Sequence, residues 1–187
     1  PPRGVDEGEG GIETALLDGL ARRAGVPLAR WLDSGAADRV PVNALVSARD
    51  PDRAAAEAAA AVAHGFATVK LKVGAALSTA AEAERVAAVR SALGPGPRLR
   101  LDANGAWGEE EAVSLLRRRE CFDLELVEQP VAADDLAALA RVRRSVGVAV
   151  AADEAVTGVD AARRVVAAGA ADLLVVKPMV VGGLGPA

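Results

Sequence analysis

The sequence is poor in the residues on which several protein classes depend. Its 187 residues include no tyrosine, two phenylalanines, two tryptophans and one cysteine. So few aromatic side chains leave no stacking platform for nucleobases, and a net charge of −4 provides no basic surface for a nucleic acid. A single cysteine, Cys121, cannot form an intramolecular disulfide, which is typical of a reducing compartment. We therefore expect a cytoplasmic protein that binds no nucleic acid.

Long apolar runs are also missing. The most apolar stretch, residues 167–185, is interrupted by Asp172 and Lys177, so we expect no membrane span. The first eleven residues, PPRGVDEGEGG, are polar and unlike the apolar centre of a secretory signal. With 51% hydrophobic and 26% charged residues, the chain has the composition of an ordinary globular protein.

Lysine is scarce, and its few positions are informative. Of 22 basic residues, 19 are arginine, and lysine stands only at Lys70, Lys72 and Lys177. A lysine amine can lose its proton at accessible pH, whereas an arginine guanidinium effectively cannot. In the segment TVKLKVG (68–74), Lys70 and Lys72 face the same side of a strand and repel each other. This arrangement predicts that opposite charges lie nearby.

Strand-like and helix-like segments alternate along most of the chain. Residues 11–32 come first and predict one or two amphipathic helices, like the end of a preceding domain. Strand followed by helix, repeated five times and closed by a sixth strand, predicts a parallel α/β architecture. The predicted strands are 40–46, 66–73, 98–103, 124–129, 146–154 and 171–177. The predicted helices are 51–64, 79–93, 109–119, 134–145 and 159–168.

Five charged residues lie near the ends of successive strands. They are Lys72, Asp102, Glu128, Asp153 and Lys177, at intervals of 30, 26, 25 and 24 residues. Each interval is about one strand–helix unit. In a (β/α)8 barrel such strand ends converge on one mouth, whereas in an open doubly wound sheet they spread along an edge. The convergence of five such groups favours the barrel.

The three carboxylates among them predict a metal site. Asp102, Glu128 and Asp153 would repel one another unless a cation joined them, and ligation by oxygen alone suits Mg²⁺. The alternative is that each is a solvent-exposed acid with no common role. A lysine close to other cations has a lowered pKa, so Lys72, beside Lys70, becomes a candidate base.

Several motifs give these residues a family context. KLK (70–72), DANGAW (102–107), VEQP (127–130), AADE (151–154) and VVKPMVVGG (175–183) resemble the muconate-lactonizing subgroup of the enolase superfamily. Within it, the motifs are most similar to the o-succinylbenzoate synthase family. The resemblance implies a (β/α)8 TIM-type barrel after an α+β capping domain. Residues 1–38 would be the last capping helices, and 39–187 a truncated barrel with strands one to six.

The resemblance also implies a role for each site residue. Asp102, Glu128 and Asp153 would bind Mg²⁺, with Mn²⁺ as a possible substitute. Lys72 would remove and return a proton, Lys70 would tune it and contact the substrate carboxylate, and Lys177 would stabilise the enediolate from the opposite face. Asn104 would support the site near the metal, and Glu154 would orient it.

The implied reaction is a Mg²⁺-dependent dehydration of a small-molecule carboxylate in menaquinone biosynthesis. Three alternatives stay open at this point. The same scaffold also serves N-acylamino acid racemases, dipeptide epimerases and muconate cycloisomerases. Lys177 could instead form a Schiff base without a metal, or the chain could be an inactive, truncated remnant. The sequence predicts no particular oligomeric state.

Overall fold

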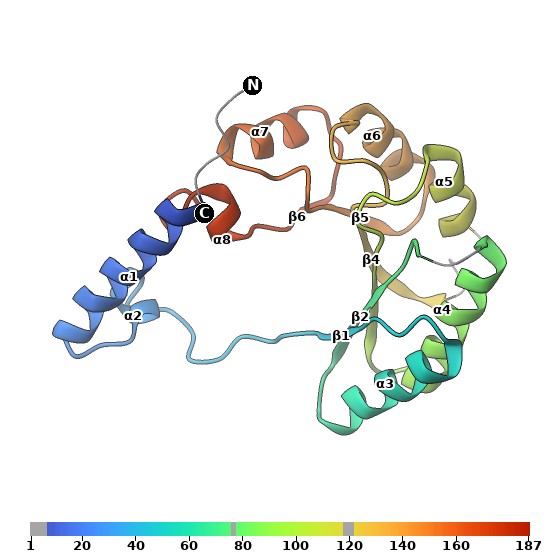
Figure 1. The fold of residues 1–187 in the computed structure, drawn as a ribbon, viewed down its shortest axis with the longest axis horizontal. Coiled ribbons are helices and arrows are strands. Elements are labelled where there is room, and N and C mark those ends of the chain that lie inside the picture. Colours follow the sequence, from blue (N-terminus) through green and yellow to red (C-terminus); the bar gives the residue numbers. More distant parts are fainter. Residues whose placement is uncertain (1–6, 76–77, 118–121) are drawn as a thin grey trace.

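The centre of the molecule is one parallel sheet of six strands. A computed structural model describes residues 7–75, 78–117 and 122–187, so Cys121 lies outside the described part. The strands pair in chain order and form a curved arc (Figure 1). This order confirms the predicted parallel α/β architecture. The strands are β1 (Ala44–Val46), β2 (Thr68–Lys72), β3 (Arg98–Asp102), β4 (Leu124–Glu128), β5 (Ala149–Ala152) and β6 (Leu173–Leu174).

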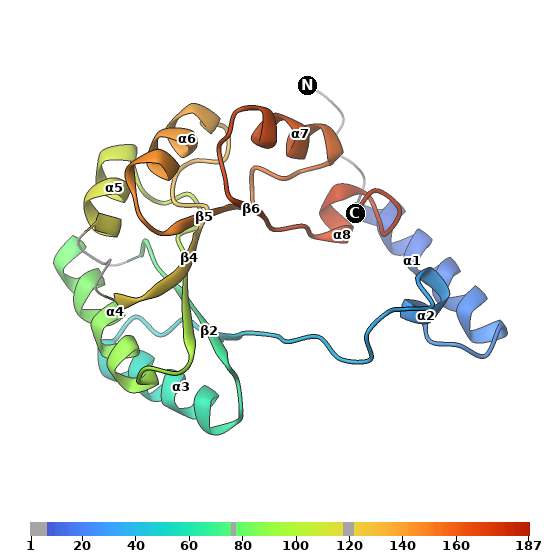
Figure 2. The ribbon, with the colours of Figure 1, turned by 180° about the vertical axis from the view of Figure 1, so that it is seen from behind.

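Five helices connect the strands and cover the outer, convex face of the arc (Figures 1 and 2). Polar side chains fix several of their first turns, because free N–H groups at a helix start need an acceptor. Asp50 accepts from the backbone N–H of Arg53 at 2.9 Å, and Asp135 accepts from that of Ala138 at 2.8 Å. The helices are α3 (Pro51–Ala63), α4 (Thr79–Leu93), α5 (Glu109–Arg117), α6 (Leu136–Ser145) and α7 (Val159–Ala167).

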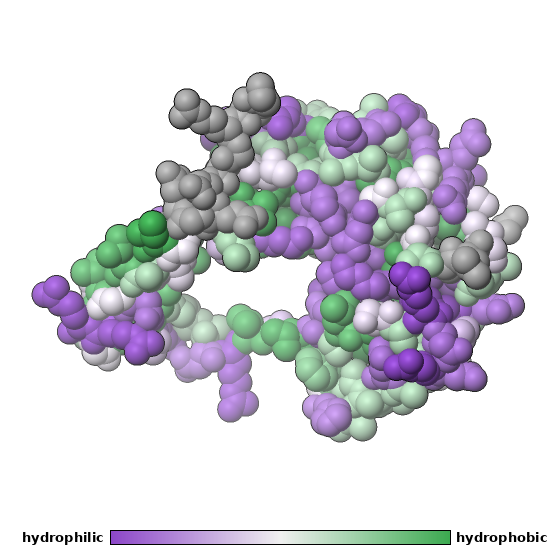
Figure 3. All heavy atoms as spheres, viewed as in Figure 1, coloured by the Kyte–Doolittle hydropathy of each residue, from purple (hydrophilic) through white to green (hydrophobic). Residues whose placement is uncertain are grey.

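The alternation within the strands separates an apolar core from a charged inner face. On β2, Val69 and Leu71 are fully buried against the helices, while Lys70 and Lys72 point to the other side. Figure 3 shows hydrophilic side chains where the sheet borders the open centre of the molecule. The core therefore lies between the sheet and the outer helices.

The inner face contains one irregularity. The pairing of β3 with β4 shifts next to Leu99 and Arg100, which places Glu125 as an extra residue in β4. A bulge of this kind turns two neighbouring side chains towards one face. Glu125 pairs with Arg100 at 2.5 Å and with Arg98 at 2.8 Å, so the bulge supplies a counter-charge for two inward arginines.

The last strand is shorter than the sequence pattern predicts. β6 contains two residues, and Lys177 lies beyond it, with an extended backbone, just before helix α8 (Pro178–Val181). The prediction of a strand reaching Lys177 was therefore wrong. Proline has no N–H for a ladder but suits the first turn of a helix, which explains why a helix begins directly after Lys177.

The N-terminal part forms α1 (Glu7–Arg23) and α2 (Leu28–Leu32), which confirms the helices expected over 11–32. These helices lie apart from the sheet and reach β1 through residues 33–43 (Figure 1). The Glu13 carboxylate accepts the N–H of Leu184 at 2.6 Å, which joins α1 to the segment after α8. The domain boundary at residue 38 stays a prediction. No helix in the described ranges is long and apolar enough to cross a membrane.

Candidate active site

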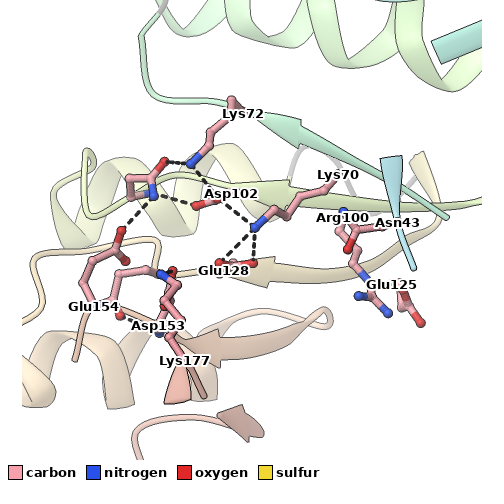
Figure 4. A network of polar contacts seen from close by, with 12 residues as sticks. Asn43, Lys70, Lys72, Arg100, Asp102, Glu125, Glu128, Asp153, Glu154 and Lys177 are labelled. Carbon is pink, nitrogen blue, oxygen red and sulfur yellow. Dashed lines mark hydrogen bonds and ion pairs between the residues drawn. The ribbon is translucent and has the colours of Figure 1, made fainter. Parts of the chain in front are cut away.

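The carboxyl ends of the strands bring the predicted charged residues together. Lys72, Asp102 and Glu128 are the last residues of β2, β3 and β4, and each lies beside the next in the pairing register. Asp153 follows β5 directly and Lys177 follows β6 by three residues. We call these five residues, together with Lys70, the strand-end cluster (Figure 4).

Asp102 is the acid of this cluster that contacts both Lys70 and Lys72. Its side chain is 1% exposed and contacts Lys72 Nζ at 2.9 Å and Lys70 Nζ at 3.1 Å. Burial favours the neutral carboxyl, but hydrogen bonds from Lys72 and Lys70 outweigh burial and lower the pKa of Asp102. The carboxylate is thus held ionised between two ammonium groups.

Lys70 bridges Asp102 to Glu128. Its Nζ donates to both carboxylate oxygens of Glu128, at 3.1 and 3.0 Å. Burial acts to lower the pKa of Lys70, but the bonds to Glu128 and Asp102 prevail and raise it. Burial raises the pKa of Glu128 despite the bond from Lys70, and repulsion from Asp102 and a side-chain hydrogen bond with Asp153 act in the same direction as burial. In the structure Lys70 is bonded to the acids. Its predicted effect on the pKa of Lys72 stays a prediction.

Lys177 approaches the cluster from the other side. Its Nζ lies 2.5 Å from Asp153 Oδ2, and its side chain is 49% exposed, against 4% for that of Asp153. Lys72 and Lys177 therefore contact different carboxylates, on β3 and after β5, with Glu128 between them along the sheet.

Asn104 and Glu154 connect the two sides. Lys72 Nζ donates to Asn104 Oδ1 at 2.7 Å, and Asn104 Nδ2 donates to Glu154 Oε1 at 2.7 Å. The other carboxylate oxygen of Glu154, Oε2, is buried without a hydrogen-bond partner among the described residues. A buried anionic oxygen left unpaired is costly, which makes it a candidate contact for a cation or a donor group of a ligand.

Gln129 is a site residue that the sequence did not reveal. It is fully buried, and its Oε1 accepts the N–H groups of Asp153 at 3.0 Å and Ala155 at 3.2 Å. Its Nε2 donates to the Val131 carbonyl at 2.9 Å. This amide fixes the backbone on which Asp153 stands. The only available signal was a polar residue between a strand-end acid and Pro130.

The donor set fits a hard divalent cation. Within the described ranges, no group of three His, Cys, Asp or Glu side chains is arranged around a common metal position, and lysines contact Asp102, Glu128 and Asp153. However, four carboxylates face three ammonium groups here. One of the four, that of Glu154, has an oxygen without a hydrogen-bond partner among the described residues. Oxygen ligands with excess negative charge suit Mg²⁺. The assignment of Asp102, Glu128 and Asp153 as ligands stays a prediction.

Comparison with known proteins identifies the family to which the chain belongs. Residues 53–187 match a family model described as Enolase C-terminal domain-like. The chain belongs to the enolase superfamily. Two curated superfamily members illustrate the range of reactions among its relatives. An L-Ala-D/L-Glu epimerase of Bacillus subtilis is 39% identical over 92% of the chain and 47% of the relative. An o-succinylbenzoate synthase of Thermobifida fusca is 46% identical over 79% of the chain and 45% of the relative.

Solved structures of the superfamily share the fold. The substrate-liganded B. subtilis epimerase matches 94% of the chain and 49% of its own length, with a TM-score of 0.88 and 38% identity. A dipeptide epimerase of Cytophaga hutchinsonii, complexed with Mg and a dipeptide, matches 92% of the chain and 46% of its own length, with a TM-score of 0.84 and 31% identity. The expected TIM-barrel fold class is confirmed. The chain spans about half the length of the curated relatives it matches.

Proposed function

We propose that the protein is a Mg²⁺-dependent dehydratase of the o-succinylbenzoate synthase type, acting in menaquinone biosynthesis. The observation that carries the proposal is the placement of Lys72 and Lys177 at two sides of one group of buried carboxylates. An amine at such a position is suited to proton transfer at a carbon next to a carboxylate. The 46% identity to an o-succinylbenzoate synthase supports this choice of reaction.

In the proposed reaction Lys72 acts as base and then as acid. Its neutral amine takes the proton from the carbon next to the substrate carboxylate. When the C–O bond at the neighbouring carbon breaks, the resulting ammonium returns the proton to the departing hydroxide, which leaves as water. Asn104, 2.7 Å from Lys72 Nζ, keeps the side chain directed at the substrate during both steps.

The other residues handle charge. Asp102, Glu128 and Asp153 would hold the Mg²⁺ ion, which when bound supplies positive charge beside the substrate carboxylate. Lys177, held by Asp153, places an ammonium on the opposite side, where it stabilises the negative charge that develops on the substrate. Besides Mg²⁺ and Lys177, Lys70 would add a third positive charge, between Asp102 and Glu128.

An epimerase of acylated amino acids or dipeptides is the second candidate. It is favoured by the 39% identity to the L-Ala-D/L-Glu epimerase and by the two lysines on different sides of the cluster. In that reaction Lys177 serves as a second acid–base group, so that one lysine removes the α-proton and the other delivers a proton to the opposite face.

Turnover in D₂O separates the candidates. The protein that contains residues 1–187 is incubated with the cyclohexadiene carboxylate precursor of o-succinylbenzoate and, separately, with L-Ala-L-Glu. We expect the aromatic product from the first and no deuterium at the α-carbons of the second. Formation of both epimers of the dipeptide, labelled with deuterium, would reject the dehydratase in favour of the epimerase. Lys72→Ala should lower the kcat of whichever reaction is found by roughly 10²- to 10⁴-fold.

The metal requirement has a readout that needs no substrate. A ligand that binds only the folded state at 100 times its Kd stabilises that state by about 2.7 kcal/mol. We therefore expect Mg²⁺ to raise the melting temperature of the wild type, and not that of Asp153→Asn. No shift with Mg²⁺ or Mn²⁺, combined with borohydride trapping of a substrate on Lys177, would instead support Schiff-base chemistry.

A further inference from the structure

The buried face of α4 breaks the pattern expected of a helix that covers a sheet. Val86, Val89 and Leu93 occupy core positions at helical spacing. The preceding positions on the same face hold Glu82 and Arg85, which are only 2% and 3% exposed. Sequences depart from a regular apolar pattern mainly at functional or strained sites. These two charges therefore require an explanation beyond the packing of the helix.

The pair is bonded internally and to the backbone of two loops. Arg85 Nε donates to Glu82 Oε1 at 3.0 Å, and the other oxygen of Glu82 accepts the N–H of Gly74 at 2.9 Å. Arg85 Nη2 donates to the Lys72 carbonyl at 2.6 Å, and Nη1 donates to the Ala48 carbonyl at 2.9 Å. Three of these four bonds thus end on the main chain at the carboxyl edge of the sheet, one of them on the last residue of β2.

Two of the three backbone bonds lie on either side of the end of β2. One holds the carbonyl of Lys72 itself, and the other holds the N–H of Gly74, two residues later. Between them, the N–H of Val73 donates to the Asp102 carbonyl at 2.8 Å. The main chain under the Lys72 side chain is therefore fixed from the sheet and from the helix. A lysine amine stands at the end of a flexible four-carbon side chain, so it is well placed only if the main chain that carries it is fixed.

Stability alone does not account for the pair. Replacing a buried ion pair by apolar residues of similar volume is often neutral or stabilising, because desolvation of the charges offsets their attraction. We propose that Glu82 and Arg85 are positioning residues for Lys72, which fix its backbone so that its amine reaches Asp102 and Asn104. The catalytic consequence rests on the proposed function of Lys72, whereas the positional consequence does not.

The decisive variant replaces both charges together. In Glu82→Leu/Arg85→Met the helix keeps apolar side chains of similar length, and no unpaired charge is buried. We expect a folded protein with unchanged KM and a kcat that is roughly 10- to 100-fold lower, the usual loss when a supporting contact of a functional residue is removed. A smaller folded fraction would also lower the apparent kcat at unchanged KM, so kcat is expressed per folded molecule, with the folded fraction taken from the unfolding curve of the same sample.

Arg90 offers a matched control on the same helix. It also donates to backbone carbonyls, those of Gly94 and, at 2.8 Å, Pro97, but these lie beyond the C-terminal end of α4, where the chain enters β3. Arg90→Met removes comparable bonds far along the helix from Lys72. We expect this variant to keep the wild-type kcat.

A second readout needs no turnover. Reductive ¹³C-methylation labels lysine amines, and residues 1–187 contribute three lysine signals to the NMR spectrum. Lys72→Arg assigns one signal by its loss. We expect the Lys72 signal to move in the double variant and to stay at its wild-type position in Arg90→Met. If the wild type catalyses neither proposed reaction, the proposed function fails, but this signal still tests the positioning of Lys72.

The inference is overturned if the double variant folds and keeps both the wild-type kcat and the wild-type Lys72 signal. Should the double variant fail to fold, Arg85→Lys decides the matter. A lysine at 85 still neutralises Glu82, but one ammonium cannot span the two carbonyls that the guanidinium holds. A shifted Lys72 signal in this variant supports the inference, and an unshifted signal rejects it.

Discussion

Lys72 and Lys177 stand at equivalent places of their strand–helix units, yet their surroundings differ greatly. Lys72 ends a five-residue strand in which Val69 and Leu71 are fully buried. Lys177 follows a two-residue strand in which Leu173 is 45% exposed. The Lys72 side chain is bonded to two side chains, and its carbonyl is held by a buried arginine. Among the described residues, the Lys177 side chain contacts Asp153 alone, and its carbonyl accepts the N–H groups of Val180 and Val181 in the following helical turn.

The difference shows that bringing an amine to the acids and fixing the backbone that carries it are separate requirements. The end of β2 is supported from the sheet, from α4 and from a neighbouring loop, so the position of Lys72 is determined by several contacts. The end of β6 brings an amine to the same group of acids with a single ion pair. The lysine of this pair is 49% exposed, so a single ion pair holds it less firmly than the several contacts hold Lys72. We therefore expect perturbations at β2 to exceed those at β6.

The largest expected difference concerns catalysis. Lys72→Ala should lower kcat roughly 10²- to 10⁴-fold, the usual contribution of a general acid–base group. Lys177→Ala should lower it by roughly 10- to 100-fold if the lysine acts only by its charge, as in the proposed dehydratase. Steady-state kinetics of both variants measure the ratio. Equal losses in the two variants would contradict the dehydratase and favour two acid–base lysines.

Apolar truncation tests the same contrast in stability. Leu101→Ala on β3 removes a fully buried side chain and should lower the free energy of unfolding by about 2–5 kcal/mol. Leu173→Ala on β6 removes a half-exposed one and should change it by less than about 0.5 kcal/mol. Urea denaturation of both variants gives the two values. A cost at Leu173 as large as at Leu101 would show that β6 is as well packed as the central strands.

Much of this contrast could be predicted from the sequence, but not all of it. The alternation of Val69, Leu71 and the two lysines predicted β2 and its two faces, because that pattern is local. The length of β6 was not predictable, since a strand exists only as far as its neighbour pairs with it, and Pro178 removes a donor just beyond Lys177.

The site shows the same division. Regular spacing of strand-end acids and lysines predicted the strand-end cluster, because strand ends in a barrel converge. Glu82, Arg85 and Gln129 were missed. In an alanine-rich helix with many charges, Glu82 and Arg85 look like solvent-facing residues, and only contacts between distant segments reveal that they are buried. The partner of Lys70, Glu128, also lies 58 residues away in the chain.

A smaller effect is expected at the turn after β2. Gly74 has a φ of +86°, and a Cβ there would lie 2.5 Å from the Cβ of Ala106. Gly74→Ala should therefore destabilise the protein by about 1–3 kcal/mol. Gly96→Ala, where a Cβ meets no atom within 4 Å, is the control and should be nearly neutral. Thermal denaturation compares them. Equal melting temperatures would show that this turn is less constrained than the contacts around Lys72 indicate.

The smallest effect concerns the ion pairs of Glu125 with Arg98 and Arg100, which lie on the inner face of the sheet before the strand-end cluster. The hydrogen bond from Arg100, opposed by partial burial and aided by Arg98, lowers the pKa of Glu125. A carboxyl with a lowered folded-state pKa adds stability above its unfolded pKa, and this stability is lost as the pH falls through the folded value. Glu125→Gln should thus cost about 0.5–1 kcal/mol at pH 7, and less near pH 3.

Urea denaturation of Glu125→Gln across this pH range measures the change. Leu173→Ala, which alters no titratable group, provides the reference series. A cost of Glu125→Gln that stays constant down to the lowest pH would show that the contact with Arg100 does not depend on the charge of the carboxylate.

The β-bulge at Glu125 has a consequence for how this sheet can evolve. Because the extra residue is absorbed where it occurs, Asp102 and Glu128 are again direct partners three positions further along. The strand can therefore gain or lose a residue at this point without reversing the direction in which Glu128 faces. Changes at Arg98, Arg100 and Glu125 are therefore separated from the acids at the strand ends. Mutation can alter these ion pairs while selection preserves the acids.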